Sequence, residues 1–341
     1  MNRPVKVGLV GVGYLGSRHL HHLISLNQVE VAGVWDTDPQ ARSNAQERGI
    51  KVFSDLDSLL QNVEAVIVAT PTSTHYDIGQ KVLESNRHLF IEKPLASSAI
   101  QGQELVEEAN KRGLVLQVGH IERFNSAFRS LFNFQIKPHF IEGHRLALWN
   151  PRGSDVAVVL DLMIHDIDLV LTLMGGNPVR ILASGVGVVT SSIDIANARL
   201  EFSQGRVANL TASRISLKRM RKLRLFGERE YISLDMEKGT CEVVKVSTKN
   251  GAKGLSWITE GLPPSPSEVL YQYSFQDTTY LISRQTIEND GKDAMELELT
   301  SFIDTIKGHK GIGATGQEAL KALIVAEEVV QAIQTNLSLK G

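Results

Sequence analysis

Cysteine is almost absent from the sequence, and neither sign of charge dominates it. Cys241 is the single cysteine among 341 residues, so an intrachain disulfide and a thiolate metal cluster are both excluded. Such cysteine usage is typical of a reducing compartment, and we expect a cytoplasmic protein. The 36 Lys and Arg residues nearly balance the 38 Asp and Glu residues, which gives a formal net charge of −2. We therefore expect no nucleic-acid partner and no attraction to an anionic membrane.

Long apolar runs are missing as well. No 18 consecutive residues are apolar, so we expect no transmembrane helix and no membrane partner. The opening stretch "MNRPVKVGLVGVG" enters a strand pattern directly and lacks the apolar core of a secretory signal. Hydrophobic residues make up 42% and charged residues 22%, an ordinary globular balance, and the length suits two domains.

Short apolar runs alternate with amphipathic segments over the first 120 residues. Continuous apolarity is typical of parallel strands that are covered on both faces. The predicted strands cover residues 5–11, 29–36, 65–70, 88–93 and 114–120. Because helical patterns lie between them, we predict a Rossmann domain with a doubly wound parallel sheet over residues 1–122.

The pattern changes after this domain. Strand-like runs follow one another without helices between them, and glycines mark their turns. These runs cover residues 180–189, 195–203, 206–216, 222–227, 230–236 and 241–248. We predict an α+β domain over residues 123–341 with an open, mostly antiparallel sheet, a helix that ends at Gly175-Gly176 and two closing helices. The fold class is therefore α/β. Residues 249–268 are rich in Gly, Pro and Ser and are predicted to form a long loop.

The stretch "GVGYLG", residues 11–16, is a complete G-x-G-x-x-G between the first predicted strand and the first helix. Gly11 permits a tight turn, Gly13 lets the backbone approach a pyrophosphate, and Gly16 allows close packing of helix and strand. The helix N-terminus supplies N–H donors and positive potential. Together with Tyr14 and Leu15, these glycines are the predicted phosphate-binding loop.

Asp36 ends the second predicted strand and favours NAD over NADP. Its carboxylate there accepts hydrogen bonds from the ribose hydroxyls of adenosine and repels a 2′-phosphate. The next residue is Thr37, not an arginine that would neutralise such a phosphate.

The carboxyl ends of the other predicted strands also have unusual residues. In a parallel sheet these ends lie at one edge, where ligands bind. In "TPTSTH" we expect Thr70, Pro71 and His75 to contact the cofactor, while the alternative for this stretch is helix capping by its hydroxyl groups. In "EKP", Glu92 and Lys93 close a very apolar strand. A lysine at this edge can bind a substrate hydroxyl and stabilise developing negative charge, and can equally contact the cofactor.

Four ionisable residues interrupt the apolar stretch "LDLMIHDIDL", residues 160–169. Burial of such groups is costly unless each has a partner or faces water. Asp161 and His165 are four residues apart and share one helical face, and Asp168 lies roughly on that face. Asp166 points about 100° away from His165, so we expect it to be a solvated or interface charge.

Several further polar residues are candidate substrate ligands. They are His120, Arg123 and Asn125 after the last strand of the first domain, and Arg152, whose guanidinium suits an anionic group such as a diphosphate. The basic run 214–224 is interpreted as solvated or interface charge, with a phosphate-facing wall as the alternative. His19, His21 and His22 lack further ligands nearby, and we expect no metal site.

Together, "GVGYLG", "TPTSTH", "EKP" and the D-x-x-x-H of Asp161 and His165 resemble the glucose-fructose oxidoreductase, inositol dehydrogenase and rhizopine catabolism (Gfo/Idh/MocA) family over nearly the whole chain. This resemblance implies NAD(P)-linked oxidoreduction of sugars or polyols and a homodimer or homotetramer formed through the C-terminal sheet. Carried over by motif, Lys93, Asp161 and His165 are the catalytic group.

A narrower resemblance involves "LQVGHIERFNSAF" and "VVLDLMIHDIDLVL". These stretches are similar to a subgroup that includes sugar-nucleotide 3-dehydrogenases, which oxidise C3 of UDP-N-acetylglucosamine before a transaminase acts in lipid A synthesis. This similarity implies hydride transfer from a sugar or sugar nucleotide to NAD. The alternatives are a dehydrogenase of a free polyol such as inositol, and a sensor of the same fold without turnover.

The expected chemistry assigns a role to each catalytic residue. His165 is the predicted general base because imidazole has an unperturbed pKa of about 6.5. Lys93 polarises the same alcohol oxygen. Asp161 either orients the imidazole or binds an adjacent hydroxyl, and Asp168 is the second candidate for orienting the ring. The nicotinamide accepts the hydride.

Overall fold

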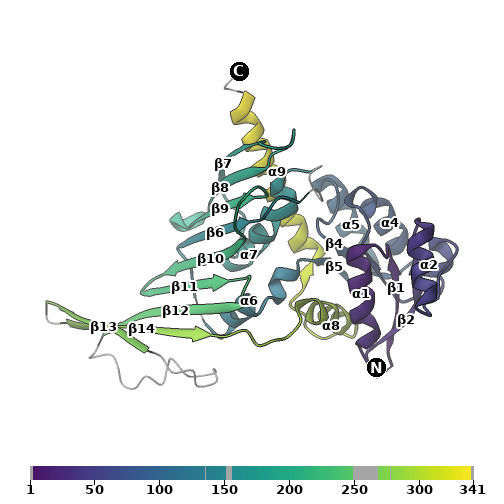
Figure 1. Cartoon of the computed structure of the whole chain (residues 1–341), viewed down its shortest axis with the longest axis horizontal. Coiled ribbons are helices and arrows are strands. Elements are labelled where there is room, and N and C mark those ends of the chain that lie inside the picture. Colours follow the sequence, from purple (N-terminus) through teal and green to yellow (C-terminus); the bar gives the residue numbers. More distant parts are fainter. Residues whose placement is uncertain (1–2, 135, 151–155, 249–267, 277, 339–341) are drawn as a thin grey trace. The chain divides into compact units, whose positions relative to one another are not determined.

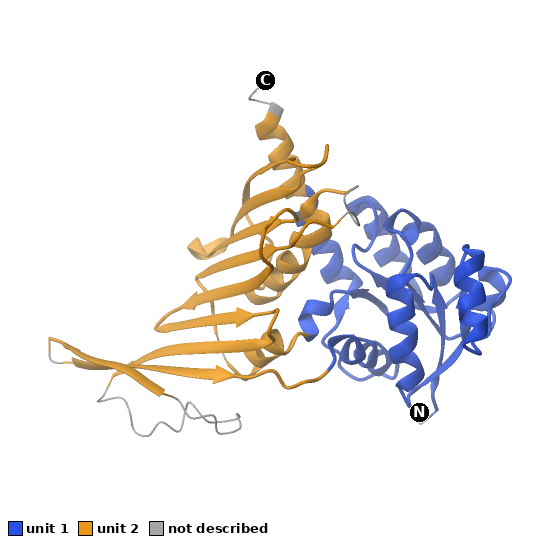
Figure 2. Cartoon of the chain, viewed as in Figure 1, with its two compact units in different colours: residues 1–124, 293–327 blue, residues 125–292, 328–341 orange. Residues whose placement is uncertain are grey.

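The computed structural model describes residues 3–134, 136–150, 156–248, 268–276 and 278–338 (Figure 1). The chain forms two compact units: residues 1–124 with 293–327, and residues 125–292 with 328–341 (Figure 2). The first change of unit falls two residues after the predicted boundary at 122. The first unit also includes a C-terminal stretch that the prediction assigned to the second domain.

The first unit contains a six-stranded sheet in the order β15-β5-β4-β3-β1-β2. Its strands are β1 (Val5–Val10), β2 (Val29–Trp35), β3 (Ala65–Val68), β4 (His88–Glu92), β5 (Leu116–Gly119) and β15 (Ala314–Thr315). All neighbouring pairs are parallel except β15 with β5. The five predicted strands are therefore present, and the predicted Rossmann sheet is confirmed.

Helices follow the parallel strands along the chain. They are α1 (Tyr14–Ser25), α2 (Pro39–Glu47), α3 (Leu56–Leu60), η1 (Thr72–Thr74), α4 (His75–Glu84), α5 (Ala99–Arg112) and η2 (Ile121–Phe124). The sequence analysis did not identify α2 and α3, which are short and begin with the N-caps Asp38 and Asp55.

Helix α8 (Ala294–Ile306) and residues 316–327 of α9 (Gly316–Ser338) belong to this first unit. The apolar face of α8 is buried in the core cluster that also contains Leu9, Leu20 and Phe90. Phe302 packs edge-on against Phe90, with their ring centroids 5.7 Å apart. Periodicity thus predicts the buried face of this helix, but it does not tell which sheet that face meets.

The second unit contains a nine-stranded sheet in the order β13-β14-β12-β11-β10-β6-β9-β8-β7. Its strands are β6 (Phe140–Leu146), β7 (Arg180–Val186), β8 (Ile195–Glu201), β9 (Val207–Ser213), β10 (Met220–Gly227), β11 (Glu230–Asp235), β12 (Thr240–Thr248), β13 (Glu268–Phe275) and β14 (Thr278–Ile287). β6 and β9 pair in parallel and the other neighbours are antiparallel. The prediction of an open, mostly antiparallel sheet is confirmed.

The remaining elements of this unit are short apart from one helix. They are α6 (Ser126–Arg129), η3 (Ser130–Asn133), the π-helical turn η4 (Val159–Met163), α7 (Ile164–Met174), η5 (Ser203–Gly205) and the last turns of α9. Helix α7 ends at Gly175 with a φ of +66°, as predicted. The hairpin of β13 and β14 was not predicted. Of the predicted loop 249–268, all but Glu268 lies outside the described residues.

Within the described part of the chain, no helix is both long enough and apolar enough to cross a membrane.

Candidate active site

Strands β1 to β5 run parallel, so their carboxyl ends lie at one edge of the first unit's sheet. Most of the predicted site residues of this unit follow these ends directly. They are Gly11–Gly16 after β1, Asp36 after β2, Thr70 and Pro71 after β3, Lys93 after β4 and His120 after β5. Because ligands of doubly wound sheets bind at this edge, the fold brings these residues to the expected position.

Two of the three glycines of the phosphate loop are sterically required, and the third borders open space. Gly11 has a φ of +86°, and an added Cβ would lie 2.7 Å from the carbonyl oxygen of Ala69. A Cβ on Gly16 would lie 1.9 Å from the carbonyl oxygen of Gly11, so the first turn of α1 packs directly against the loop. A Cβ on Gly13 would meet no atom within 4 Å. The loop therefore packs tightly against the protein at Gly11 and Gly16 and has open space beside Gly13.

A pocket of about 580 Å³ lies beside this loop. Its lining includes Val12, Gly13 and Tyr14 of the loop, Arg18 of α1 and Asp38 before α2. The open space at Gly13 and the N-terminal turn of α1 fit the pyrophosphate of a dinucleotide, which approaches backbone N–H groups at such a helix start.

The carboxylate of Asp36 connects the loop to the end of β2. Oδ2 accepts a hydrogen bond from the Val12 backbone N–H at 2.7 Å, and Oδ1 accepts one from the Asp38 N–H at 2.8 Å. A carboxylate oxygen can accept two hydrogen bonds, so each oxygen of Asp36 keeps the capacity to accept one more from a ribose hydroxyl. Asp36 thus fixes the loop and keeps the capacity to accept hydrogen bonds from the ribose hydroxyls of adenosine, as predicted.

His75 is buried where the loop after β3 meets the loop after β4. Its Nδ1 lies 2.9 Å from the Pro94 carbonyl oxygen and its Nε2 lies 3.0 Å from the Thr70 carbonyl oxygen. Burial lowers the pKa of His75, and these two carbonyl groups oppose the shift only in part. An imidazole with one N–H donates to only one of these two carbonyl oxygens, so His75 links the two loops through one hydrogen bond and one close contact. Thr70 itself is half-buried and Pro71 is exposed.

Lys93 is half-buried and follows the buried Glu92, and the Lys93–Pro94 peptide bond is cis. Glu92 Oε1 lies 2.6 Å from Nε2 of His19 in α1. Glu92 Oε2 accepts the backbone N–H of Lys93 at 3.2 Å. The sequence analysis considered His19 only as a metal ligand and missed this contact, because nothing in a sequence pairs residues that are 73 positions apart.

The residues after β5 have structural partners. His120 is buried. Arg123 is also buried, and its guanidinium lies 3.2 Å from the Glu318 carboxylate at the start of α9. Asn125 caps α6 through its side-chain oxygen and donates to the Met236 carbonyl oxygen at 2.8 Å. Arg152 lies outside the described residues.

Asp161 and His165 lie on consecutive turns of different type in the second unit. Asp161 belongs to the π-helical turn η4, and His165 is the second residue of α7. Both side chains are half-buried, whereas Asp168 is 1% exposed. π-Turns inside helices are frequent at functional sites, because the extra residue changes the direction in which the side chains point.

The prediction for Asp166 is wrong. Asp166 is buried and receives two hydrogen bonds from the guanidinium of Arg145 in β6, at 2.7 and 3.0 Å. The Asp166 carboxylate points away from His165, as helical geometry predicts, but it points toward the sheet and not toward water. A bidentate arginine partner satisfies both carboxylate oxygens in the core.

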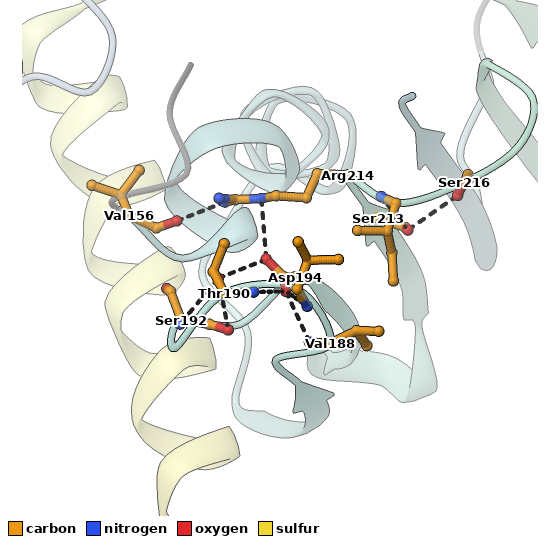
Figure 3. Close-up of polar contacts among 10 residues, drawn as sticks. Val156, Val188, Thr190, Ser192, Asp194, Ser213, Arg214 and Ser216 are labelled. Carbon is orange, nitrogen blue, oxygen red and sulfur yellow. Dashed lines mark hydrogen bonds and ion pairs between the residues drawn. The ribbon is translucent and has the colours of Figure 1, made fainter. Parts of the chain in front are cut away.

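A second buried ion pair lies near the start of this helical segment (Figure 3). Asp194 is fully buried and accepts the backbone N–H groups of Val188, Val189 and Thr190 at 2.7–2.9 Å. The Arg214 guanidinium lies 3.9 Å from Asp194. Burial would raise the pKa of Asp194, but these N–H groups and the Thr190 hydroxyl outweigh it and hold the pKa well below its ordinary value.

This pair connects the turn after β7 to the residues before η4. Arg214 donates to the Val156 carbonyl oxygen at 2.6 Å, and the Val158 N–H donates to the Ile193 carbonyl oxygen at 2.9 Å. The approach to the helix with Asp161 and His165 is thereby fixed. The sequence analysis did not assign any role to Asp194.

The basic run 214–224 does not act as one surface. Arg214 is buried with Asp194, whereas Lys218 and Arg219 are exposed. Lys222 lies 3.6 Å from Asp235 and Arg224 lies 2.9 Å from Glu142, both across strand pairs of the sheet. This dispersal agrees with solvated charge at the exposed positions, but the expectation is wrong for Arg214, which is buried as the partner of Asp194.

Among the described residues, no group of three or more His, Cys, Asp or Glu side chains is arranged to hold a metal ion.

The parallel sheet, the phosphate loop and the acid after β2 define a dinucleotide-binding protein. Residues 5–120 match the family described as "Oxidoreductase family, NAD-binding Rossmann fold", and residues 117–233 match the "GFO/IDH/MocA C-terminal domain". The chain belongs to the GFO/IDH/MocA family of oxidoreductases. The resemblance seen in the sequence is thereby confirmed, together with its prediction of an NAD-dependent dehydrogenase.

Individual relatives differ in what their names say they act on. UDP-N-acetylglucosamine 3-dehydrogenase of Acidithiobacillus ferrooxidans is 31% identical over 98% of both chains. A solved structure of that protein superposes with a TM-score of 0.83 over 97% of this chain and 98% of that one. A scyllo-inositol 2-dehydrogenase of Bacillus subtilis is 29% identical over 63% of this chain and 69% of its own length.

Proposed function

We propose that the chain oxidises a secondary alcohol of a sugar nucleotide with NAD, and that the substrate is UDP-N-acetylglucosamine, reacting at C3, or a related UDP-sugar. The observation that favours this substrate is the similarity to UDP-N-acetylglucosamine 3-dehydrogenase, which extends over 98% of both chains. The product, a 3-keto sugar nucleotide, is a substrate for a transaminase, which agrees with a role before lipid A assembly.

The catalytic group in this proposal is Lys93, Asp161 and His165. His165 takes the hydroxyl proton as general base, because its side chain is only half-buried and imidazole is the side chain best suited to accept a proton near neutral pH. Lys93 donates a hydrogen bond to the same oxygen and stabilises the charge that develops on it. Asp161 orients the imidazole or binds a neighbouring hydroxyl, and Asp168 is the alternative orienting group.

When bound, NAD supplies the hydride acceptor. The residues proposed to hold it are Gly11, Gly13, Tyr14, Leu15, Gly16, Asp36, Thr70, Pro71, His75, Glu92 and Lys93. Among these, the buried His75 and Glu92 act through the loops that they fix, since each makes its hydrogen bonds to protein groups.

The proposed substrate ligands are His120, Arg123, Asn125 and Arg152, besides Asp161 and His165. Arg152 is the residue proposed for a diphosphate, because a guanidinium binds such oxygens in pairs.

A second candidate is a free-polyol dehydrogenase. The observation that favours it is the 29% identity to scyllo-inositol 2-dehydrogenase. The third candidate, a sensor without turnover, does not need Lys93, Asp161 and His165 together, and all three are present.

One experiment separates these candidates. NADH absorbance is followed with UDP-N-acetylglucosamine, other UDP-sugars, myo-inositol and scyllo-inositol. The proposal is supported if a UDP-sugar has a higher kcat/KM than either inositol. Turnover of inositols alone supports the second candidate. Binding of NADH without turnover of any of these compounds supports the sensor.

The catalytic roles are tested with matched variants. His165→Ala and Lys93→Ala are expected to lower kcat by about 10²–10⁴-fold, the usual contribution of a positioned acid or base. The exposed residues His139 and Lys81 provide the controls His139→Ala and Lys81→Ala. A loss below about tenfold in either catalytic variant would remove that residue from the mechanism.

We also propose that the chain forms a homodimer or homotetramer through the open face of the nine-stranded sheet. On this face Phe140, Phe226 and Tyr231 form an aromatic cluster with centroid distances of 5.6 and 4.9 Å. Light scattering of the wild type and of Phe226→Glu tests the proposal, since a charge within the cluster is expected to dissociate the oligomer.

A further inference from the structure

The contact between His19 and Glu92 is a buried polar pair next to Lys93. His19 is 0% exposed and Glu92 is 8% exposed, and their Nε2 and Oε1 atoms lie 2.6 Å apart. His19 belongs to α1, the helix that begins at the phosphate loop, and Glu92 is the last residue of β4. The pair therefore connects the cofactor loop's helix to the residue before the lysine.

The hydrogen-bond pattern makes His19 the donor of this pair. A carboxylate only accepts hydrogen bonds, so Nε2 of His19 donates its N–H to Oε1 of Glu92. Nδ1 of His19 has no hydrogen-bond partner within the described residues, so Glu92 is the polar group that holds the ring.

The Glu92 carboxylate is held on its other oxygen as well. Oε2 accepts the Lys93 backbone N–H at 3.2 Å. A Cβ on Gly119 in β5 would lie 2.7 Å from the same oxygen, so the carboxylate packs against bare backbone there. These contacts fix the carboxylate between α1, β5 and the lysine's own peptide group.

We propose that His19 and Glu92 are positioning residues that fix the backbone of Lys93 relative to the phosphate loop. This inference rests on the proposed role of Lys93 in catalysis and cofactor binding. Neither residue acts on the substrate. The carboxylate holds the Lys93 N–H, and His19 holds the carboxylate in register with α1. Because a misplacement of about 1 Å in a reacting group costs about 10²-fold in rate, loss of the pair affects the reaction through the lysine.

Three single variants distinguish an effect of the His19–Glu92 pair on the reaction from a general loss of stability. His19→Leu removes the donor and is expected to lower kcat for UDP-N-acetylglucosamine by about 10²-fold. His19→Gln keeps an N–H donor within reach of Glu92 and is expected to retain most of the activity. His88→Leu is the control, because half-buried His88 accepts the Val115 N–H at 3.0 Å at the opposite end of the same strand.

A double-mutant cycle decides whether His19 acts through the lysine. In a Lys93→Ala background, adding His19→Leu is expected to produce no further loss in kcat or in the dissociation constant of NADH. An effect of His19→Leu no larger than that of His88→Leu would overturn the proposal. The proposal would also be overturned if His19→Leu lowered kcat or NADH affinity by the same factor in the Lys93→Ala background as in the wild type. A merely structural residue gives such additive effects.

The measurement of NADH affinity in this cycle keeps the test independent of the proposed substrate. If the wild type turns over neither UDP-sugars nor inositols, the proposed function fails. The cycle on NADH affinity, measured by NADH fluorescence, then still decides whether His19 and Lys93 are coupled.

Discussion

Asp36 in the first unit and two buried acids in the second unit are stabilised in different ways. At the strand ends of the first unit, Asp36 accepts backbone N–H groups from its own neighbourhood and from the phosphate loop. In the second unit, Asp166 and Asp194 are buried and each faces an arginine, Arg145 and Arg214. The first arrangement leaves lone pairs for a ligand, whereas the second uses the acids to fix the elements around a helix.

A difference in burial also separates two acids within one helical segment of the second unit. Asp161 and Asp166 both interrupt the same apolar stretch, yet one is half-buried and the other is bidentate with Arg145. A buried charge requires a partner, and the fold provides it from a strand 21 residues away. We therefore interpret Asp166 as a structural residue, whereas Asp161 stays in the proposed catalytic group.

The largest expected effect is on the Arg145–Asp166 pair. Asp166→Ala removes the carboxylate and leaves a buried guanidinium without its counter-ion, so the free energy of unfolding is expected to fall by about 3–5 kcal/mol. Urea denaturation measures it. The double variant Arg145→Leu/Asp166→Leu is the matched control and is expected to recover most of the loss. If Asp166→Ala lowers stability by less than about 1 kcal/mol, the pair is no more important than an exposed one.

The next effect concerns Asp194 and depends on pH. Asp194→Asn replaces an acceptor of N–H groups with an amide and is expected to cost about 2–3 kcal/mol, as for hydrogen bonds to a charged group. The folded-state pKa of Asp194 is lowered, so its stabilisation is present above the unfolded pKa of about 3.9 and is lost as pH falls toward the folded value.

Urea denaturation of wild type and Asp194→Asn across pH 3–8 measures this dependence. The difference between the two proteins is expected to be constant above about pH 5 and to shrink below about pH 4. A difference that grows on acidification would contradict the assignment.

A smaller effect is expected at Asp36 in the first unit. The wild type should bind NADH more tightly than NADPH, and Asp36→Asn should reduce this preference by about tenfold, or about 1.4 kcal/mol, because the repulsion of a 2′-phosphate is lost. The control is Asp55→Ala, which removes the N-cap of α3 in the same unit and should leave the preference unchanged. Fluorescence titration with both nucleotides measures the ratio, and equal affinities in the wild type would refute the NAD preference.

The smallest effect is expected at Cys241, a buried residue of the second unit without charge. Burial raises the pKa of its thiol to about 11, so almost no thiolate exists at neutral pH. The folded protein should react with a thiol reagent only as fast as it unfolds. Rapid reaction under native conditions would show that β12 opens locally.

The sequence predicted most of the fold because periodicity and glycine spacing are local signals. The five parallel strands, the phosphate loop, the helix end at Gly175 and six strands of the second sheet were all found this way. The sequence analysis did not identify α2, α3 and the β13–β14 hairpin. Two closing helices were predicted, but not the core that the apolar face of α8 enters.

The candidate site was predictable to the extent that it follows strand ends. The sequence placed Asp36, Lys93 and His120 after parallel strands, and the direction of those strands brings their ends to one edge. It also identified Asp161 and His165 as exceptions in an apolar helix, because charge is costly there.

Only the tertiary structure decided the partners of the buried charges. His19 with Glu92, Arg145 with Asp166 and Arg214 with Asp194 are separated by 73, 21 and 20 positions. No local pattern links such residues, since the free energy of each contact depends on which elements pack together. The sequence by itself determined the class of protein and the residues available for its chemistry, and tertiary packing decided which of those residues stay available to a ligand and which are used to hold the fold.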